Sequence, residues 1–161
     1  MVELGRVLVV GAGIAGCSVA ATLAARGARV TVVEKQAEWR FQSSGIFVYA
    51  NGLESLRRVG VLPGILQAGF AIEDGRNAYF DHLGVRIVDT FYPRSPAGDV
   101  PPILGIKRAE MHRVLAARMQ ALGVQVRLAT TVVALDSPSD PSAVRATFSD
   151  GSTEGFDLVV G

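Results

Sequence analysis

A glycine-rich turn between a strand and a helix constrains the fold of this chain more than any other sequence feature. Arg6–Val10 reads RVLVV, a β-branched run that is apolar on both faces and typical of a covered parallel strand. Residues 14–26 are rich in alanine and leucine and predict a helix that ends at Gly27. Residues 29–34, RVTVVE, predict a second buried strand. Strand, helix and strand in about 30 residues predict a βαβ unit and an α/β fold.

The turn itself has the pattern G-x-G-x-x-G, formed by Gly11, Gly13 and Gly16. The first glycine permits a tight turn, the second lets backbone amides approach a pyrophosphate, and the third lets the helix pack closely. The N-terminus of the helix adds N–H donors and a partial positive charge. Glu34 ends the second strand, where a carboxylate can accept hydrogen bonds from an adenosine ribose and repel a 2′-phosphate. We therefore expect a dinucleotide other than NADP, and not a plain loop with an exposed Glu34.

The remaining elements mix helices with antiparallel strands. We expect a helix from an Asn51 cap to about residue 59, a short helix opened by Pro63, and a helix over 108–122. Residues 78–82 and 85–91 predict a hairpin, whereas 35–50 and 94–102 look irregular. Further strands are expected at 124–128, 131–135, 144–148 and 156–160, with a turn at Asp150-Gly151. The predicted class is α/β, a Rossmann-like βαβ domain with antiparallel β additions.

Composition excludes several classes of protein. The 161 residues suit about one domain, and 49% hydrophobic with 19% charged residues is an ordinary globular composition. The net charge of +1 is spread along the chain, which argues against a nucleic-acid partner. No apolar run approaches the roughly 20 residues that a membrane helix needs. The single cysteine, Cys17, precludes an internal disulfide and fits a cytoplasmic protein.

Sequence motifs after the turn resemble one family. The spacing from Gly11 to Glu34 resembles the adenine-nucleotide motif of flavoproteins, although NAD enzymes share it. The segments EKQAEWRFQSSGIFVYANGLESLRRVGV, IKRAEMHRVL and FDLVVG resemble, in order, those of FAD-dependent aromatic hydroxylases of the para-hydroxybenzoate hydroxylase type. The resemblance covers essentially the whole chain, and it favours FAD over NAD as the dinucleotide.

The resemblance also implies which residues contact the cofactor. The residues at the pyrophosphate would be Gly11, Gly13, Ala15 and Gly16. The adenosine ribose would be held by Glu34 and Lys35, and the adenine would be contacted by the backbone of Val133. Those nearer the flavin would be Arg40 and Arg108 at the ribose-phosphate part, with Ser44, Gly45 and Ile46 on the flavin side.

Helical spacing gives Arg108 some independent support. Arg108 falls within the apolar stripe of its helix, through Met111 and Leu115, and a buried guanidinium needs an anionic partner such as a diphosphate. Arg118 falls on the same stripe, so the spacing alone does not separate a cofactor ligand from a snorkelling or salt-bridged arginine. For Arg40 the two interpretations stay equally open.

No side chain presents itself as a catalytic group or a metal ligand. His82 and His112 have no serine, cysteine or metal-spaced partner, so we expect both to be structural or solvated. Cys17 lies beside Gly16 in a closely packed helix and is expected to be a small buried residue. The catalytic residues therefore stay unassigned.

The ending FDLVVG resembles the strand that, in the hydroxylases, precedes an Ala-Asp-Gly turn and then a substrate domain. Residues 1–161 are accordingly expected to form an incomplete FAD-binding domain, inactive alone, of a monooxygenase that hydroxylates a small aromatic substrate with NADH or NADPH and oxygen. The remainder of the enzyme would then be a partner of this chain. Two alternatives stay open: another FAD oxidoreductase of the same fold, and a non-catalytic dinucleotide-binding module or half of a two-chain complex.

Overall fold

The structure, a computed structural model, describes residues 5–39, 44–96, 98–136 and 143–161. The described helices are α1 (Ile14–Ala24), α2 (Ala50–Val59), α3 (Leu62–Ala68) and α4 (Arg108–Ala121). The described strands are β1 (Arg6–Val10), β2 (Arg29–Val33), β3 (Gly45–Tyr49), β4 (Phe70–Ile72), β5 (Arg76–Phe80), β6 (Arg86–Phe91), β7 (Ile103–Lys107), β8 (Gln125–Arg127), β9 (Val132–Asp136), β10 (Val144–Phe148), β11 (Thr153–Phe156) and β12 (Leu158–Val160). The chain divides into two compact units, residues 1–41 with 112–161, and residues 42–111.

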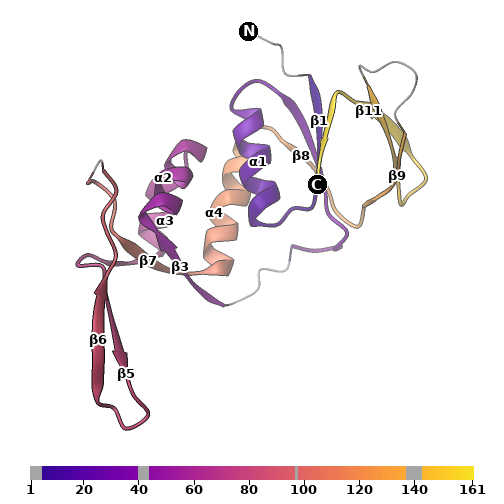
Figure 1. The fold of residues 1–161 in the computed structure, drawn as a ribbon. Helices are drawn as coiled ribbons and strands as arrows, with labels where there is room; N and C mark the ends of the chain where they lie inside the picture. Colours follow the sequence, from indigo (N-terminus) through magenta and orange to yellow (C-terminus); the bar gives the residue numbers. More distant parts are fainter. Residues whose placement is uncertain (1–4, 40–43, 97, 137–142) are drawn as a thin grey trace. The chain divides into compact units, whose positions relative to one another are not determined.

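The first unit contains the predicted βαβ arrangement. A four-stranded sheet has the order β12-β1-β2-β8, and every neighbouring pair in it is parallel (Figure 1). Strands β1 and β2, which precede and follow α1 in the sequence, pair along their whole length. Their register runs from Arg6 opposite Arg29 to Val10 opposite Val33. The buried, β-branched strands and the parallel pairing confirm the Rossmann-like prediction.

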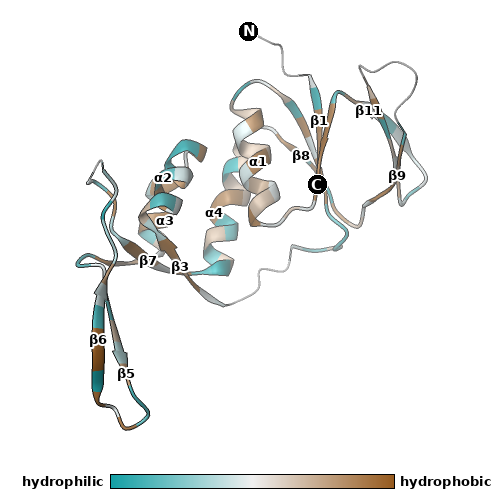
Figure 2. Ribbon diagram, in the orientation of Figure 1, coloured by the Kyte–Doolittle hydropathy of each residue, from teal (hydrophilic) through white to brown (hydrophobic). Residues whose placement is uncertain are grey.

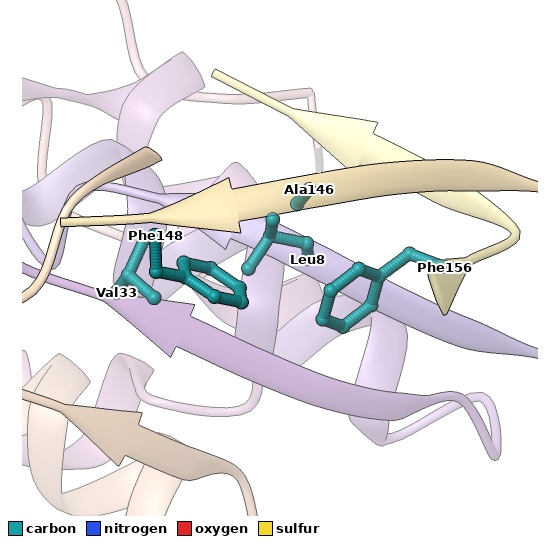
Figure 3. Packing of buried hydrophobic residues seen from close by; sticks show 5 residues of the cluster. All are labelled: Leu8, Val33, Ala146, Phe148 and Phe156. Carbon is teal, nitrogen blue, oxygen red and sulfur yellow. The ribbon is translucent and has the colours of Figure 1, made fainter. Parts of the chain in front are cut away.

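Helix α1 and an antiparallel sheet cover opposite faces of this parallel sheet. The helix buries Cys17, Ala20 and Ala21, whose small side chains allow close packing. On the other face, strands β9, β10 and β11 form a three-stranded antiparallel sheet. Five side chains fill the space between the two sheets (Figure 3): Leu8 and Val33 from the parallel sheet, and Ala146, Phe148 and Phe156 from the antiparallel one. This cluster supports the two strands that lead into the glycine turn and Glu34.

The second unit is built on the antiparallel sheet β3-β7-β4. Helices α2 and α3 contribute Leu53, Leu56 and Ile65 to its core, and the sheet contributes Val48 and Leu104. Strands β5 and β6 form a separate hairpin. Figure 2 shows the middle of β6 in brown, and its apolar residues Ile87 and Val88 are 67% and 48% exposed.

The structure corrects several predicted boundaries. Strand β3 lies in a segment predicted to be irregular, and β4, β7 and β11 were not predicted. Helix α2 begins at Ala50 after Tyr49, so Asn51 is not the N-cap of this helix. The side chain of Asn51 instead accepts a hydrogen bond from the Gly52 amide. The hairpin turn at Asp150-Gly151 is confirmed, with Gly151 at φ +83°. No helix in the described ranges is long and apolar enough to cross a membrane.

Candidate functional site

The glycine turn between β1 and α1 depends on the absence of side chains at two positions. Gly11 has φ +100°, a conformation that other residues rarely adopt, and its amide donates to the Val33 carbonyl at 2.7 Å. A Cβ added to Gly16 would overlap the carbonyl oxygen of Gly11. The first and third glycines are therefore required by the backbone itself.

The outer side of the same turn is open. A Cβ added to Gly13 would meet no atom of the described residues within 4 Å, and the same holds for Gly11. Gly13 is the N-cap of α1, and the described residues supply neither a capping side chain nor an acid in the first helical turn. Since the first amides of a helix lack intrahelical acceptors, this end of α1 suits a bound anion. No side chain in the described part of the chain fills the turn at Gly11 or Gly13, so the turn has room for a diphosphate.

Glu34 is fixed beside the turn. Its Oε2 accepts the amide of Ala12 at 2.9 Å, and its Oε1 accepts the amide of Gln36 at 2.9 Å. Its own backbone amide donates to the Arg127 carbonyl at 2.9 Å. A carboxylate offers about four lone pairs, so two acceptor positions remain for ribose hydroxyls. This half-buried carboxylate next to the turn contradicts the alternative of an exposed Glu34 in a plain loop.

The carbonyl oxygen of Ala12 accepts two hydrogen bonds. His112 Nε2 of α4 lies 2.6 Å from this oxygen, and Cys17 Sγ lies 3.3 Å from it. Burial raises the pKa of Cys17 from 9.0 to about 11, and the negative charge of Glu34 acts in the same direction. Cys17 is buried, as expected, and its thiol stays protonated at neutral pH.

The raised pKa of Cys17 predicts a loss of stability in alkali. Between pH 9 and about 11 the unfolded chain releases the thiol proton while the folded chain retains it, so the free energy of unfolding falls as pH rises. We expect Cys17 to contribute a decrease on the order of 1–2 kcal/mol across this range. Urea unfolding at several pH values, compared with Cys17→Ala, isolates this contribution. Equal pH dependence in the two proteins would contradict the prediction.

The predicted flavin-side residues come together in the second unit. The carbonyl of Ser44 accepts the backbone amide of Arg108 at 2.8 Å, and Gly45 lies opposite Lys107 in the β3–β7 ladder, one residue before Ile46. The expectation of a buried Arg108 guanidinium is wrong, because this first residue of α4 is exposed. Arg118 on the same stripe is the half-buried one, and its Nε is buried without a hydrogen-bond partner among the described residues.

A groove on the open face of β3-β7-β4 was not foreseen from the sequence. Its volume is about 630 Å³, and Gly45 and Ile46 line it together with residues of β4 and β7. Phe47 and Phe70 are 65% and 77% exposed, and both pair with Gly105, which lies between them in the sheet. Phe70 could be a flavin- or substrate-side aromatic on sequence grounds, with core packing as the default expectation, and its exposure shows that the default is wrong. Phe47 and Gly105 do not stand out in the sequence, because strands β3 and β7 were not predicted.

The remaining residues predicted to contact the cofactor are exposed or lie outside the described residues. Lys35 follows Glu34 and is exposed, and Ala15 is exposed in the first turn of α1. Val133 is 61% exposed on β9. Arg40 lies outside the described residues.

Comparison with known proteins finds relatives that match nearly the whole of this chain. The 3-amino-4-hydroxybenzoate 2-monooxygenase of Streptomyces cremeus is 33% identical, over 97% of this chain and 39% of that protein. The FAD-dependent urate hydroxylase of Mycolicibacterium vanbaalenii is 29% identical over 97% of this chain and 39% of its own length. A solved structure of a 2-methyl-3-hydroxypyridine-5-carboxylic acid oxygenase variant has a TM-score of 0.81 at 29% identity, covering 99% of this chain and 39% of that one.

The chain thus spans about 39% of the length of these relatives. The family described as the FAD binding domain matches residues 5–158, nearly the whole chain and both of its compact units. This protein is therefore a member of the FAD binding domain family.

Proposed function

We propose that this chain binds FAD at the glycine turn and forms the cofactor-binding part of a flavin-dependent monooxygenase. The observation that carries the proposal is the turn itself. Its backbone requires Gly11 and Gly16, leaves open space outside Gly13, and places the Glu34 carboxylate beside it. These features fit a diphosphate joined to an adenosine ribose.

In this proposal the backbone of Gly11, Gly13, Ala15 and Gly16 binds the diphosphate. Glu34 uses its two remaining acceptor positions for the ribose hydroxyls, with Lys35 next to it. The exposure of Arg108 leaves its guanidinium accessible to a phosphate, and Arg40 is assigned the same kind of contact. Ser44, Gly45 and Ile46 lie toward the flavin, and the backbone of Val133 contacts the adenine.

We extend the proposal to the whole protein, a monooxygenase that hydroxylates a small aromatic compound with NADH or NADPH and oxygen. When bound, FAD supplies the redox chemistry, and the protein supplies binding, orientation and exclusion of water. The names of the relatives support a hydroxylation of this kind. We assign no side chain as acid, base or nucleophile. The lone buried thiol is consistent with the cytoplasmic location that we include in the proposal.

FAD titration of the purified chain tests the cofactor assignment. We expect saturable quenching of flavin fluorescence and no comparable binding of NADP, whose 2′-phosphate would meet the Glu34 carboxylate. Glu34→Ala removes the acceptor of the Ala12 amide as well as the ribose contact. It should weaken FAD binding by about 10- to 100-fold, as expected for the loss of hydrogen bonds to a charged group.

A matched control is Glu38→Ala, since Glu38 is exposed on the same loop. This variant should bind FAD as the unmodified chain does. If the chain binds NAD more tightly than FAD, the alternative of an NAD-binding module replaces the proposal. If Glu34→Ala and Glu38→Ala bind FAD equally well, the assignment of Glu34 fails.

A further inference from the structure

The hydrogen bond from His112 to Ala12 joins α4 to the glycine turn within the first unit. The Nε2···O distance is 2.6 Å, and a carbonyl oxygen can only accept, so Nε2 carries the hydrogen. Resting on the function proposed above, we propose that His112 is a positioning residue for the cofactor. It holds the peptide between Ala12 and Gly13 so that the Gly13 amide faces the diphosphate.

The orientation of the peptide group between Ala12 and Gly13 decides where the Gly13 N–H points. In a trans peptide the C=O of one residue and the N–H of the next point in opposite directions. The Ala12 carbonyl points into the protein, toward His112 and Cys17, and Ala12 is only 1% exposed. The Gly13 N–H must therefore point away from the interior. That is the side on which a Cβ at Gly13 would meet none of the described atoms within 4 Å.

The opposite orientation of this peptide would oppose binding. A rotated peptide would direct the Ala12 carbonyl oxygen at the diphosphate, where two partial negative charges repel, and would remove one N–H donor. The two hydrogen bonds to this carbonyl occupy both of its lone pairs and oppose the rotation. A thiol is a weak donor, so the stronger restraint comes from His112.

Neighbouring groups hold both the imidazole and the turn. The ring of Trp39 meets the ring of His112 edge-on, with centroids 6.2 Å apart and an interplanar angle of 67°. On the other side of the turn, the Ala12 amide donates to Glu34. Ala12 is thus restrained at its N–H by a carboxylate and at its C=O by an imidazole, which leaves little freedom for the Gly13 amide.

Two substitutions separate hydrogen bonding from packing. His112→Gln can place an amide N–H at a reach comparable to Nε2, whereas His112→Leu has no donor. We expect His112→Leu to weaken FAD binding about tenfold, the effect of one hydrogen bond, and His112→Gln to stay within about threefold. His82→Leu, at an exposed histidine of the β5–β6 hairpin, serves as a control without effect.

A second measurement needs no cofactor. In the ligand-free ¹⁵N-labelled chain, the Gly13 amide resonance should move in His112→Leu and stay near its original position in His112→Gln. Urea unfolding tests whether each variant is folded. If His112→Leu does not fold, the test rests on His112→Gln, whose FAD affinity and Gly13 amide resonance are compared with those of the unmodified chain.

Specific results would overturn the inference. The inference fails if His112→Leu binds FAD as tightly as the unmodified chain, or if folded His112→Gln binds FAD as weakly as His112→Leu. Should the unmodified chain not bind FAD at all, the proposed function fails. In that case the Gly13 resonance alone decides whether His112 orients the peptide, and an unmoved resonance in His112→Leu refutes this.

Discussion

Gly16→Val is expected to abolish detectable FAD binding and to lower the free energy of unfolding by roughly 3 kcal/mol. A Cβ at this position would overlap the carbonyl oxygen of Gly11, so the contact is with backbone and cannot be relieved by a side-chain rotation. The side chain of Val9 lies 3.5 Å from the same point, which leaves no room for the valine methyl groups. The turn would have to open, and the amides that face the diphosphate would move with it. Urea unfolding and FAD titration measure the two effects.

Gly13→Ala is the matched control, because its Cβ would enter open space and its φ of −75° suits alanine. We expect its free energy of unfolding to stay within about 1 kcal/mol of the unmodified value, the scale of an N-cap substitution. FAD binding should nevertheless weaken tenfold or more, because the new methyl group stands where the diphosphate approaches. The description of the turn would be contradicted if Gly16→Val had the same free energy of unfolding and the same affinity for FAD as the unmodified chain. Equal FAD affinity in Gly13→Ala would show that the diphosphate lies elsewhere.

The glycine turn was predictable because its determinants are local. Strand, turn, helix and strand follow one another within residues 6–34, and each shows its own pattern in the sequence. Gly11 and Gly16 were expected at positions that need a tight turn and close packing, and the structure gives each a steric reason. Family resemblance then narrowed the ligand from a dinucleotide to FAD.

The antiparallel strands of the second unit were harder to predict because their pairing is non-local. Strand β3 pairs with β7, more than fifty residues later, and nothing in the segment GIFVY specifies that partner. The groove between Phe47 and Phe70 exists only once β3, β7 and β4 are assembled. A pattern of alternating apolar residues cannot reveal a groove whose floor, Gly105, comes from a third segment.

Hydrogen bonds between residues far apart in the sequence were also not predicted. His112 meets Ala12 across 100 positions of sequence, and no short sequence motif indicates a contact over that separation. Arg108 was assigned to the buried stripe from helical spacing alone. The structure begins α4 at this residue, so no preceding helical turn covers its side chain. Helical periodicity predicts the face on which a residue lies but not whether another element covers the end of the helix.

Phe148→Ala should lower the free energy of unfolding by about 3–5 kcal/mol. Phe148 is 1% exposed, and it meets the ring of Phe156 edge-on at a centroid distance of 6.3 Å. The guanidinium of Arg127 lies 4.3 Å from the centroid of the Phe148 ring, so the substitution also removes a cation–π contact. Leu8, Val33, Ala146 and Phe156 pack with Phe148 between the two sheets (Figure 3), and Val10, Val132 and Val159 pack against this cluster. These neighbours are anchored on strands, so they cannot fill the cavity without moving a strand.

The same substitution separates support of the fold from contact with the cofactor. Phe148 packs with Leu8 and Val33 between the two sheets and is not among the residues assigned to the cofactor, so the folded fraction of Phe148→Ala should bind FAD with nearly unchanged affinity. Excess FAD at 100 times its dissociation constant should then restore about 2.7 kcal/mol of stability by mass action. Phe91→Ala, at a residue 65% exposed on the hairpin, is the control and should change stability by about 0.5 kcal/mol or less. A loss of stability in Phe148→Ala no larger than in Phe91→Ala would contradict the two-sheet core, and failure of FAD to stabilise the variant would indicate that the cluster also shapes the binding site.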